Sequence, residues 1–110
     1  MAIKRGDIYM ADLSAATEGC EQGGFRPVLV IQNDKGNYHA PTVIIAPISS
    51  QMHKARFPTH VMLDCLQRSS FAELEQIRTI DKRRLGNYLG QIDGRTQERV
   101  DNAIKISLAV

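Results

Sequence analysis

Residues 26–48 read RPVLVIQNDKGNYHAPTVIIAPI and decide how the chain is expected to fold. The runs Arg26–Gln32 and Thr42–Ile48 are rich in β-branched residues and are too continuous for half-exposed strands. Strands that are covered on both faces have this pattern, so we predict two central, buried strands. The segment between them, Asn33–Asn37, is a dense turn signal and suggests that the two strands form a hairpin.

Shorter strand-like runs continue on both sides of this pair. Strands are predicted over residues 7–13, 59–63 and 87–92, and the first alternates, with Ile8 and Met10 on one side. The stretch 71–80 mixes helix-favouring and strand-favouring residues. We interpret it as one more strand.

Helical signals are confined to two places near the C-terminus. A short helical turn is predicted at Asp81–Leu85, and Thr96 can cap a terminal helix after Asp93-Gly94. Four residues of that helix recur at helical spacing: Val100, Ala103, Ile104 and Ser107. Many short strands with one terminal helix imply a mainly β fold, a small and partly open β-barrel with added helices.

The composition describes one ordinary globular domain. The chain has 110 residues, of which 43% are hydrophobic and 24% charged, so residues 1–110 are expected to form a single domain. Recurrent apolar runs exclude intrinsic disorder, and none approaches the roughly 20 residues of a membrane span. No signal peptide is apparent, so a cytoplasmic protein with free thiols at Cys20 and Cys65 is expected. The net charge of +2 permits a polyanionic partner without requiring one.

The sequence contains no standard motif for catalysis, cofactor binding or metal binding. There is no phosphate-binding loop, no dinucleotide fingerprint and no nucleophile elbow, so no cofactor is expected. The two cysteines have no CxxC partner and the three histidines lack ligand spacing, which argues against a metal. We expect His60, in a strand-like run, to have a packing or hydrogen-bonding role.

Three features are candidates for function. The segment from Ser14 to Gly24 is long for a connection between strands, so it is either a functional loop or a tolerated surface loop. Arg26 begins a buried run, a costly position for a charge unless it faces a groove; the alternative is an ordinary solvent-exposed strand end. Ser49-Ser50 ends the second run and can simply cap a turn. If the two strands are neighbours, Arg26 and Ser49 meet at one edge and form a phosphate site.

The sequence resembles the MazF/PemK family of toxin endoribonucleases over nearly its whole length, most closely the group found in Gram-positive bacteria. Six blocks that keep their order carry the resemblance: KRGDIY at 4–9, EQGGFRPVLVIQN at 21–33, APISS at 46–50, PTHV at 58–61, LEQIRTIDKRRL at 74–85 and ISL at 106–108. The resemblance implies an SH3-like β-barrel homodimer with a C-terminal helix. It also implies sequence-specific, metal-independent cleavage of single-stranded RNA that leaves 2′,3′-cyclic phosphate and 5′-OH ends.

The resemblance also implies roles for particular residues. Arg26 matches the family's catalytic arginine, and Ser49 matches a position that is commonly threonine and binds the scissile phosphate. Cys20 lies where close relatives often have serine. The residues expected to contact RNA are Cys20, Glu21, Gln22, Phe25, Glu75, Gln76 and Arg78. For Glu75 and Arg78 an intramolecular ion pair or a dimer contact is an equally good interpretation.

The expected partners are single-stranded RNA, a second copy of the chain, and an antitoxin whose acidic C-terminal segment covers the Arg26 groove. Two other functions remain open. One is a non-catalytic toxin on the same barrel that binds a protein such as DNA gyrase. The other is an RNA-binding or adaptor barrel without chemistry.

Overall fold

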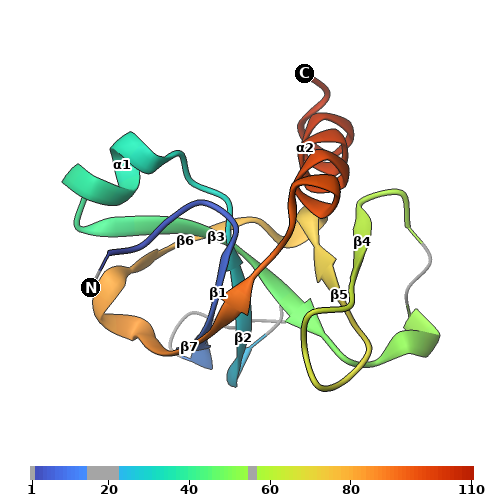
Figure 1. Cartoon of the computed structure of the whole chain (residues 1–110), viewed down its shortest axis with the longest axis horizontal. Coiled ribbons are helices and arrows are strands. Elements are labelled where there is room, and N and C mark those ends of the chain that lie inside the picture. The colour runs from blue at the N-terminus through green and yellow to red at the C-terminus, as the bar shows by residue number, and fades with distance from the viewer. Residues whose placement is uncertain (1, 15–22, 55–56) are drawn as a thin grey trace.

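A computed structural model describes residues 2–14, 23–54 and 57–110 of the chain, and its strands outnumber its helices in Figure 1. The strands and α-helices are β1 (Asp7–Asp12), β2 (Phe25–Val30), α1 (Asp34–His39), β3 (Thr42–Ser49), β4 (His60–Leu63), β5 (Ser70–Glu73), β6 (Arg78–Asp81), β7 (Leu85–Gln91) and α2 (Gly94–Leu108). Three 3₁₀ turns are η2 (Met52–Lys54), η3 (Leu74–Gln76) and η4 (Lys82–Arg84). The predicted class, mainly β with a C-terminal helix, is confirmed. So is the helical turn predicted at Asp81–Leu85.

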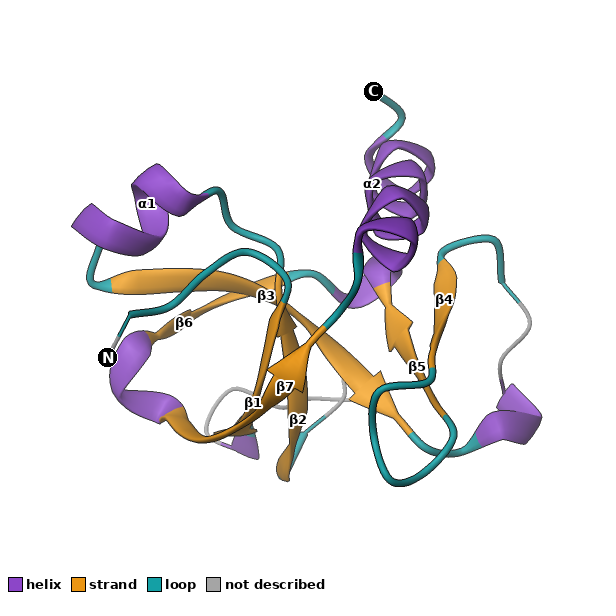
Figure 2. Cartoon of the chain, in the orientation of Figure 1, coloured by secondary structure: helices purple, strands orange, loops and turns teal. Residues whose placement is uncertain are grey.

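Strand β3 joins the two parts of a seven-stranded antiparallel sheet. The strand order is β4-β5-β3-β2-β1-β7, and β6 also pairs with β3. On one edge, β3 pairs with β2; on the other, it pairs first with β6 over Thr42–Ile45 and then with β5 at Ile48 and Ser49. The sheet therefore bends about β3, which crosses the middle of the molecule in Figure 2.

The central strands are buried on both faces because apolar clusters lie on each side. Leu29 belongs to a cluster that includes Val100 and Ala103 of α2. Its neighbours Val28 and Val30 point the other way and pack in a second cluster. Successive side chains of a strand alternate between faces, so two covered faces need a continuous apolar run. The buried strands predicted from residues 26–32 and 42–48 are confirmed.

The connection between β2 and β3 differs from a simple hairpin turn. The two strands are antiparallel neighbours, as predicted, but helix α1 connects them. The side chain of Asn33 caps this helix by accepting from the backbone N–H of Gly36 at 2.8 Å. Asn37 is buried and exchanges side-chain hydrogen bonds with Gln32. These buried amide contacts, between residues five apart in the sequence, stabilise the helical conformation of the polar segment.

The stretch 71–80 is not a single strand, so that prediction was wrong. Strands β5 and β6 are separated there by η3. The backbone N–H of Leu74 donates to Thr59 O at 3.0 Å, and Leu74 O accepts from the Ser107 hydroxyl at 2.8 Å. The buried Leu74 side chain is held between β4 and α2, which forces the chain to turn.

Helix α2 begins one turn earlier than its predicted cap. Asp93 is the N-cap, and its carboxylate accepts from the backbone N–H of Thr96 at 2.8 Å. That hydrogen bond holds the pKa of Asp93 below its ordinary value. The predicted inner face is confirmed, because Val100 and Ala103 are buried. No helix in the described ranges combines the length and apolar character that crossing a membrane requires.

A buried carboxylate and a buried phenol form a pair on β1. Asp7 is 4% exposed and accepts hydrogen bonds from Lys4 N, Gln91 Nε2 and the Tyr9 hydroxyl, the last at 3.3 Å. Burial and the neighbouring Asp7 carboxylate raise the pKa of Tyr9 to about 12 from its ordinary value of 10.0. The folded state therefore binds the phenolic proton more tightly than the unfolded chain does.

This shift predicts a loss of stability in alkaline solution. The stabilisation is fully present below pH 10 and is lost as the pH rises toward 12, by about 2 kcal/mol. We expect Tyr9→Phe to remove most of this pH dependence, because phenylalanine does not titrate. Urea unfolding of both proteins between pH 9 and 11.5, followed by circular dichroism, measures the difference. Tyr38→Phe is the control, because Tyr38 is 83% exposed. If Tyr9→Phe loses as much unfolding free energy at alkaline pH as the parent protein does, the loss does not come from Tyr9.

Candidate active site

The β2–β3 register brings Arg26 and Ser49 to the same edge of the sheet. Val28 pairs with Pro47 and Leu29 with Ala46, and Arg26 and Ser49 each lie two residues beyond the last of these pairs, Val28 with Pro47. Both residues line one cleft of about 660 Å³. The neighbouring strands on which the phosphate-site prediction depended are therefore present.

A glycine pair positions the Arg26 guanidinium. The Nε–H of Arg26 donates to Gly23 O at 2.9 Å. Gly24 has φ +77°, a left-handed conformation that favours glycine, and its carbonyl accepts from Leu13 N at 2.8 Å. In the part of the chain that the structure describes, no carboxylate pairs with Arg26. Among the described residues, its terminal N–H groups have no carboxylate partner in the cleft.

Ser49 is buried, with 4% of its surface exposed, although it lines the cleft. Its hydroxyl oxygen accepts from the backbone N–H of Gln51 at 3.1 Å. A serine hydroxyl has one hydrogen to donate in addition to the lone pairs that accept. Ser49 therefore caps the turn after β3 and keeps a donor for a bound phosphate.

The cleft is lined by distant parts of the sequence. Its lining residues come from β1, β2, β7, the end of β3, the start of β5 and the segment between β4 and β5. They are Met10, Phe25, Arg26, Pro27, Ile48, Ser49, Ser50, Gln51, Cys65, Leu66, Gln67, Arg68, Ser70 and Leu89. The predicted residue Phe25 lies at the rim with 66% of its surface exposed, where it can stack on a base.

The part of the cleft lined by Cys65–Arg68 was not predicted from the sequence. These residues follow a predicted strand and have no periodic pattern, so only their polar composition pointed to a loop. Cys65 is a free thiol, as predicted, and partial burial raises its pKa above the ordinary value. The RNA contacts predicted for Cys20, Glu21 and Gln22 lie outside the residues that the structure describes.

The other predicted RNA contacts do not line the cleft. Glu75 accepts hydrogen bonds from the Thr59 hydroxyl at 2.9 Å and from His60 Nε2 at 2.8 Å. Arg78 pairs across β6 and β3 with Ile45, four residues before Ser49, roughly 13 Å along a strand. Gln76 ends η3, between these two. The structure therefore separates this group from Arg26 and Ser49.

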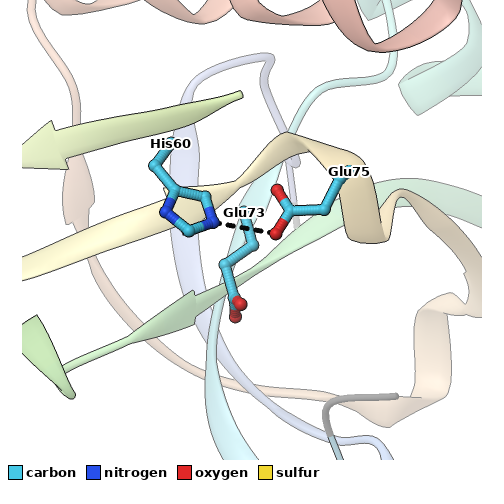
Figure 3. A group of neighbouring side chains, drawn as sticks. All are labelled: His60, Glu73 and Glu75. Atoms are coloured by element: carbon cyan, nitrogen blue, oxygen red, sulfur yellow. Dashed lines mark hydrogen bonds and ion pairs between the residues drawn. The ribbon is translucent and has the colours of Figure 1, made fainter. Parts of the chain in front are cut away.

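The predicted packing and hydrogen-bonding role of His60 is confirmed. Its ring lies against Phe57 and Phe71, with centroid separations of 5.0 and 4.6 Å. Figure 3 shows the ring joined to Glu75 by the hydrogen bond, with Glu73 on the adjacent strand. These three ionisable side chains could hold a metal ion, since their ligand atoms lie within 4.8 Å of one another. None of them lines the Arg26 cleft.

The chain is similar to known proteins over almost its whole length. The PemK-like, MazF-like toxin family of type II toxin–antitoxin systems matches residues 4–108. Endoribonuclease EndoA of Bacillus subtilis is 53% identical over 114 aligned residues, which cover 100% of this chain and 97% of the relative. A mycobacterial endoribonuclease solved with its cognate antitoxin is 25% identical, with a TM-score of 0.77 over 99% of this chain and 95% of that one.

The fold agrees with a more distant relative as well. MazF from Deinococcus radiodurans is 22% identical and has a TM-score of 0.86 over 100% of this chain and 99% of its own. The family match covers nearly the whole chain and includes the strands that carry Arg26 and Ser49. The chain belongs to the PemK-like, MazF-like family of toxins of type II toxin–antitoxin systems.

Proposed function

We propose that this chain is the toxin of a toxin–antitoxin pair and cleaves single-stranded RNA in the cleft that Arg26 and Ser49 line. The observation that carries the proposal is that Arg26 and Ser49 line one cleft. Family membership and the 53% identity with an endoribonuclease support the same activity. A gyrase-binding toxin is not favoured, because the similar proteins are named endoribonucleases.

The proposed reaction needs no external nucleophile. The ribose 2′ oxygen attacks the adjacent phosphorus and loses its proton, and the bond from phosphorus to the 5′ oxygen breaks. The 5′ oxygen takes up a proton, which leaves a 2′,3′-cyclic phosphate and a 5′-OH end. Negative charge builds up on the phosphate oxygens in between, so donors aimed at those oxygens accelerate the reaction.

Arg26 and Ser49 have complementary roles in this proposal. The Arg26 guanidinium stabilises the phosphorane, since it stays charged at ordinary pH and presents a planar fork to phosphate. The family's arginine also takes part in proton transfer, and Arg26 matches it. The Ser49 hydroxyl donates to the scissile phosphate while its oxygen accepts from Gln51 N.

Incubation of the pure protein with RNA in EDTA tests this function. We expect cleavage at a short recurrent sequence, because no step uses a metal ion. Primer extension maps the sites, and kinase labelling before and after acid treatment identifies 5′-OH and cyclic-phosphate ends. Intact RNA of varied sequence after prolonged incubation contradicts the nuclease and favours a binding barrel; cleavage that EDTA abolishes contradicts the mechanism.

The same proposal includes a homodimer and an antitoxin. Helix α2 and the edge strand β4 contact each other. Both carry apolar side chains that remain exposed, among them Met62, Ile106 and Leu108. Burial of these groups favours pairing with a second copy. We propose that an acidic antitoxin segment covers the Arg26 cleft and excludes RNA, and that the pair acts in the cytoplasm. Residues 1–110 would form the single toxin domain.

A further inference from the structure

The segment Asp64–Ser69, between β4 and β5, forms a wall of the cleft that the proposed reaction does not use. Cys65, Leu66, Gln67 and Arg68 all line the same cleft as Arg26 and Ser49. At the base of this wall, Phe71 of β5 pairs with Ser49 of β3. The segment therefore ends two residues before the strand partner of Ser49, one of the two residues assigned to the scissile phosphate.

This wall is held in place by two contacts within the fold. Leu66 packs against the apolar cluster that also contains Leu63 and Val100. The Ser70 hydroxyl donates to the backbone carbonyl of Arg68 at 3.0 Å. Arg68 is therefore attached to an anchored backbone, and part of the entropy cost of ordering it is already met.

The Arg68 side chain is exposed and lines the cleft. Elsewhere, Arg5 pairs with Asp101 at 2.9 Å and Arg83 with Asp81 at 3.0 Å. Within residues 2–14, 23–54 and 57–110, no carboxylate forms such a pair with Arg68. Two guanidinium groups, those of Arg26 and Arg68, thus line one cleft.

The volume of the cleft exceeds what a single phosphate group needs. About 660 Å³ lies within the roughly 300–1,000 Å³ of sites that hold drug-sized ligands. An RNA strand carries one negative charge per nucleotide, so a strand that puts its scissile phosphate at Arg26 brings a neighbouring phosphate into the same cleft. A guanidinium binds phosphate through two parallel N–H donors.

We propose that Arg68 is a second phosphate-binding residue, which holds the RNA backbone next to the scissile phosphate and positions the strand across the cleft. The proposal rests on the proposed function. Arg68 contacts a phosphate that does not react, so it contributes to RNA binding and leaves the chemical step unchanged.

The test uses a short RNA that carries the mapped cleavage site, with 2′-O-methyl ribose at the reacting position to prevent cleavage. We expect Arg68→Ala to weaken binding about tenfold, the loss typical of one hydrogen bond to a charged group. The slope of log affinity against log salt should fall by about 0.7, the value for one phosphate contact on a single strand. Arg68→Lys should keep most of that slope, because it keeps the charge.

Kinetics separate this positioning role from a catalytic one. On cleavable RNA, KM should rise by the same factor and kcat should stay within about twofold. Arg95→Ala is the matched control, because it removes one exposed arginine from α2 outside the cleft. Arg68→Ala should fold normally, since the carbonyl that Ser70 contacts is retained.

Three results distinguish the possible failures. Unchanged affinity and salt slope in Arg68→Ala, with an active parent protein, overturn the proposal for Arg68 alone. A fall in kcat with unchanged KM also overturns it, because Arg68 would then act on the reacting phosphate. A parent protein that neither binds nor cleaves RNA overturns the proposed function itself.

Discussion

Arg26→Ala is expected to lower the single-turnover rate of RNA cleavage at least about 10²–10³-fold, the cost of removing one preorganised donor. The loss should exceed that of a neutral donor, because the substitution removes a charge as well as hydrogen bonds. Arg26→Lys should lose most of the activity too. A lysine ammonium is a point charge and cannot both donate to Gly23 O, as Arg26 Nε does, and present a fork to phosphate.

The measurement uses saturating enzyme and a short RNA that carries the mapped site. Circular dichroism shows whether the variants keep the fold, and Arg95→Ala reports the effect of removing an arginine outside the cleft. Arg26 is half-buried near the start of β2, and its pairing with Ala11 of β1 is a backbone pairing that alanine retains. If Arg26→Ala retains more than about a tenth of the parent rate while Arg95→Ala is normal, Arg26 is not the main stabiliser of the transition state.

Ser49→Ala should lower the same rate about 10²–10³-fold, because it removes the hydroxyl proposed to donate to the scissile phosphate. The structure adds a second effect. The backbone N–H of Gln51 loses its acceptor, so we also expect a loss of about 1 kcal/mol in the free energy of unfolding. Rate and stability must therefore be measured on each variant, by single-turnover cleavage and urea unfolding.

Two further variants make the result specific. Ser49→Thr keeps the hydroxyl and restricts its χ1 angle, so it should retain or raise the activity. Ser50→Ala removes a neighbouring hydroxyl that lines the same cleft and should change the rate little. If Ser49→Ala cleaves within about threefold of the parent, far less than the loss of one donor, Ser49 only caps the turn.

The polar segment 33–37 shows how far local patterns extend. Its composition correctly marked the end of one strand and the return of the next as an antiparallel neighbour. The composition did not predict helix α1, because that helix depends on the buried contacts of Asn37 with Gln32.

The start of α2 is a second example. The Asp93 and Thr96 side chains are both able to cap a helix, and the backbone conformation decided that Asp93 does so.

In the candidate site, too, local patterns predicted some features and the folded structure decided others. The strands that carry Arg26 and Ser49 were predicted because each has a continuous apolar run, and their pairing followed from the short connection. Glu75 was grouped with the RNA contacts by resemblance. The structure shows it bonded to Thr59 and His60, so its predicted contact with RNA would compete with those hydrogen bonds.

By itself, the sequence determined the class of fold, the two central strands and the inner face of α2. All of these depend on side-chain chemistry at short spacing along the chain, which periodicity records. The resemblance to a toxin family rests instead on six blocks of residues that keep their order along the chain. Only the tertiary structure decided the break at Leu74 and the wall of the cleft at Cys65–Arg68. Both features depend on which distant elements cover Leu66 and Leu74. Such packing joins residues of separate strands and a helix, so it leaves no periodic signal in the sequence.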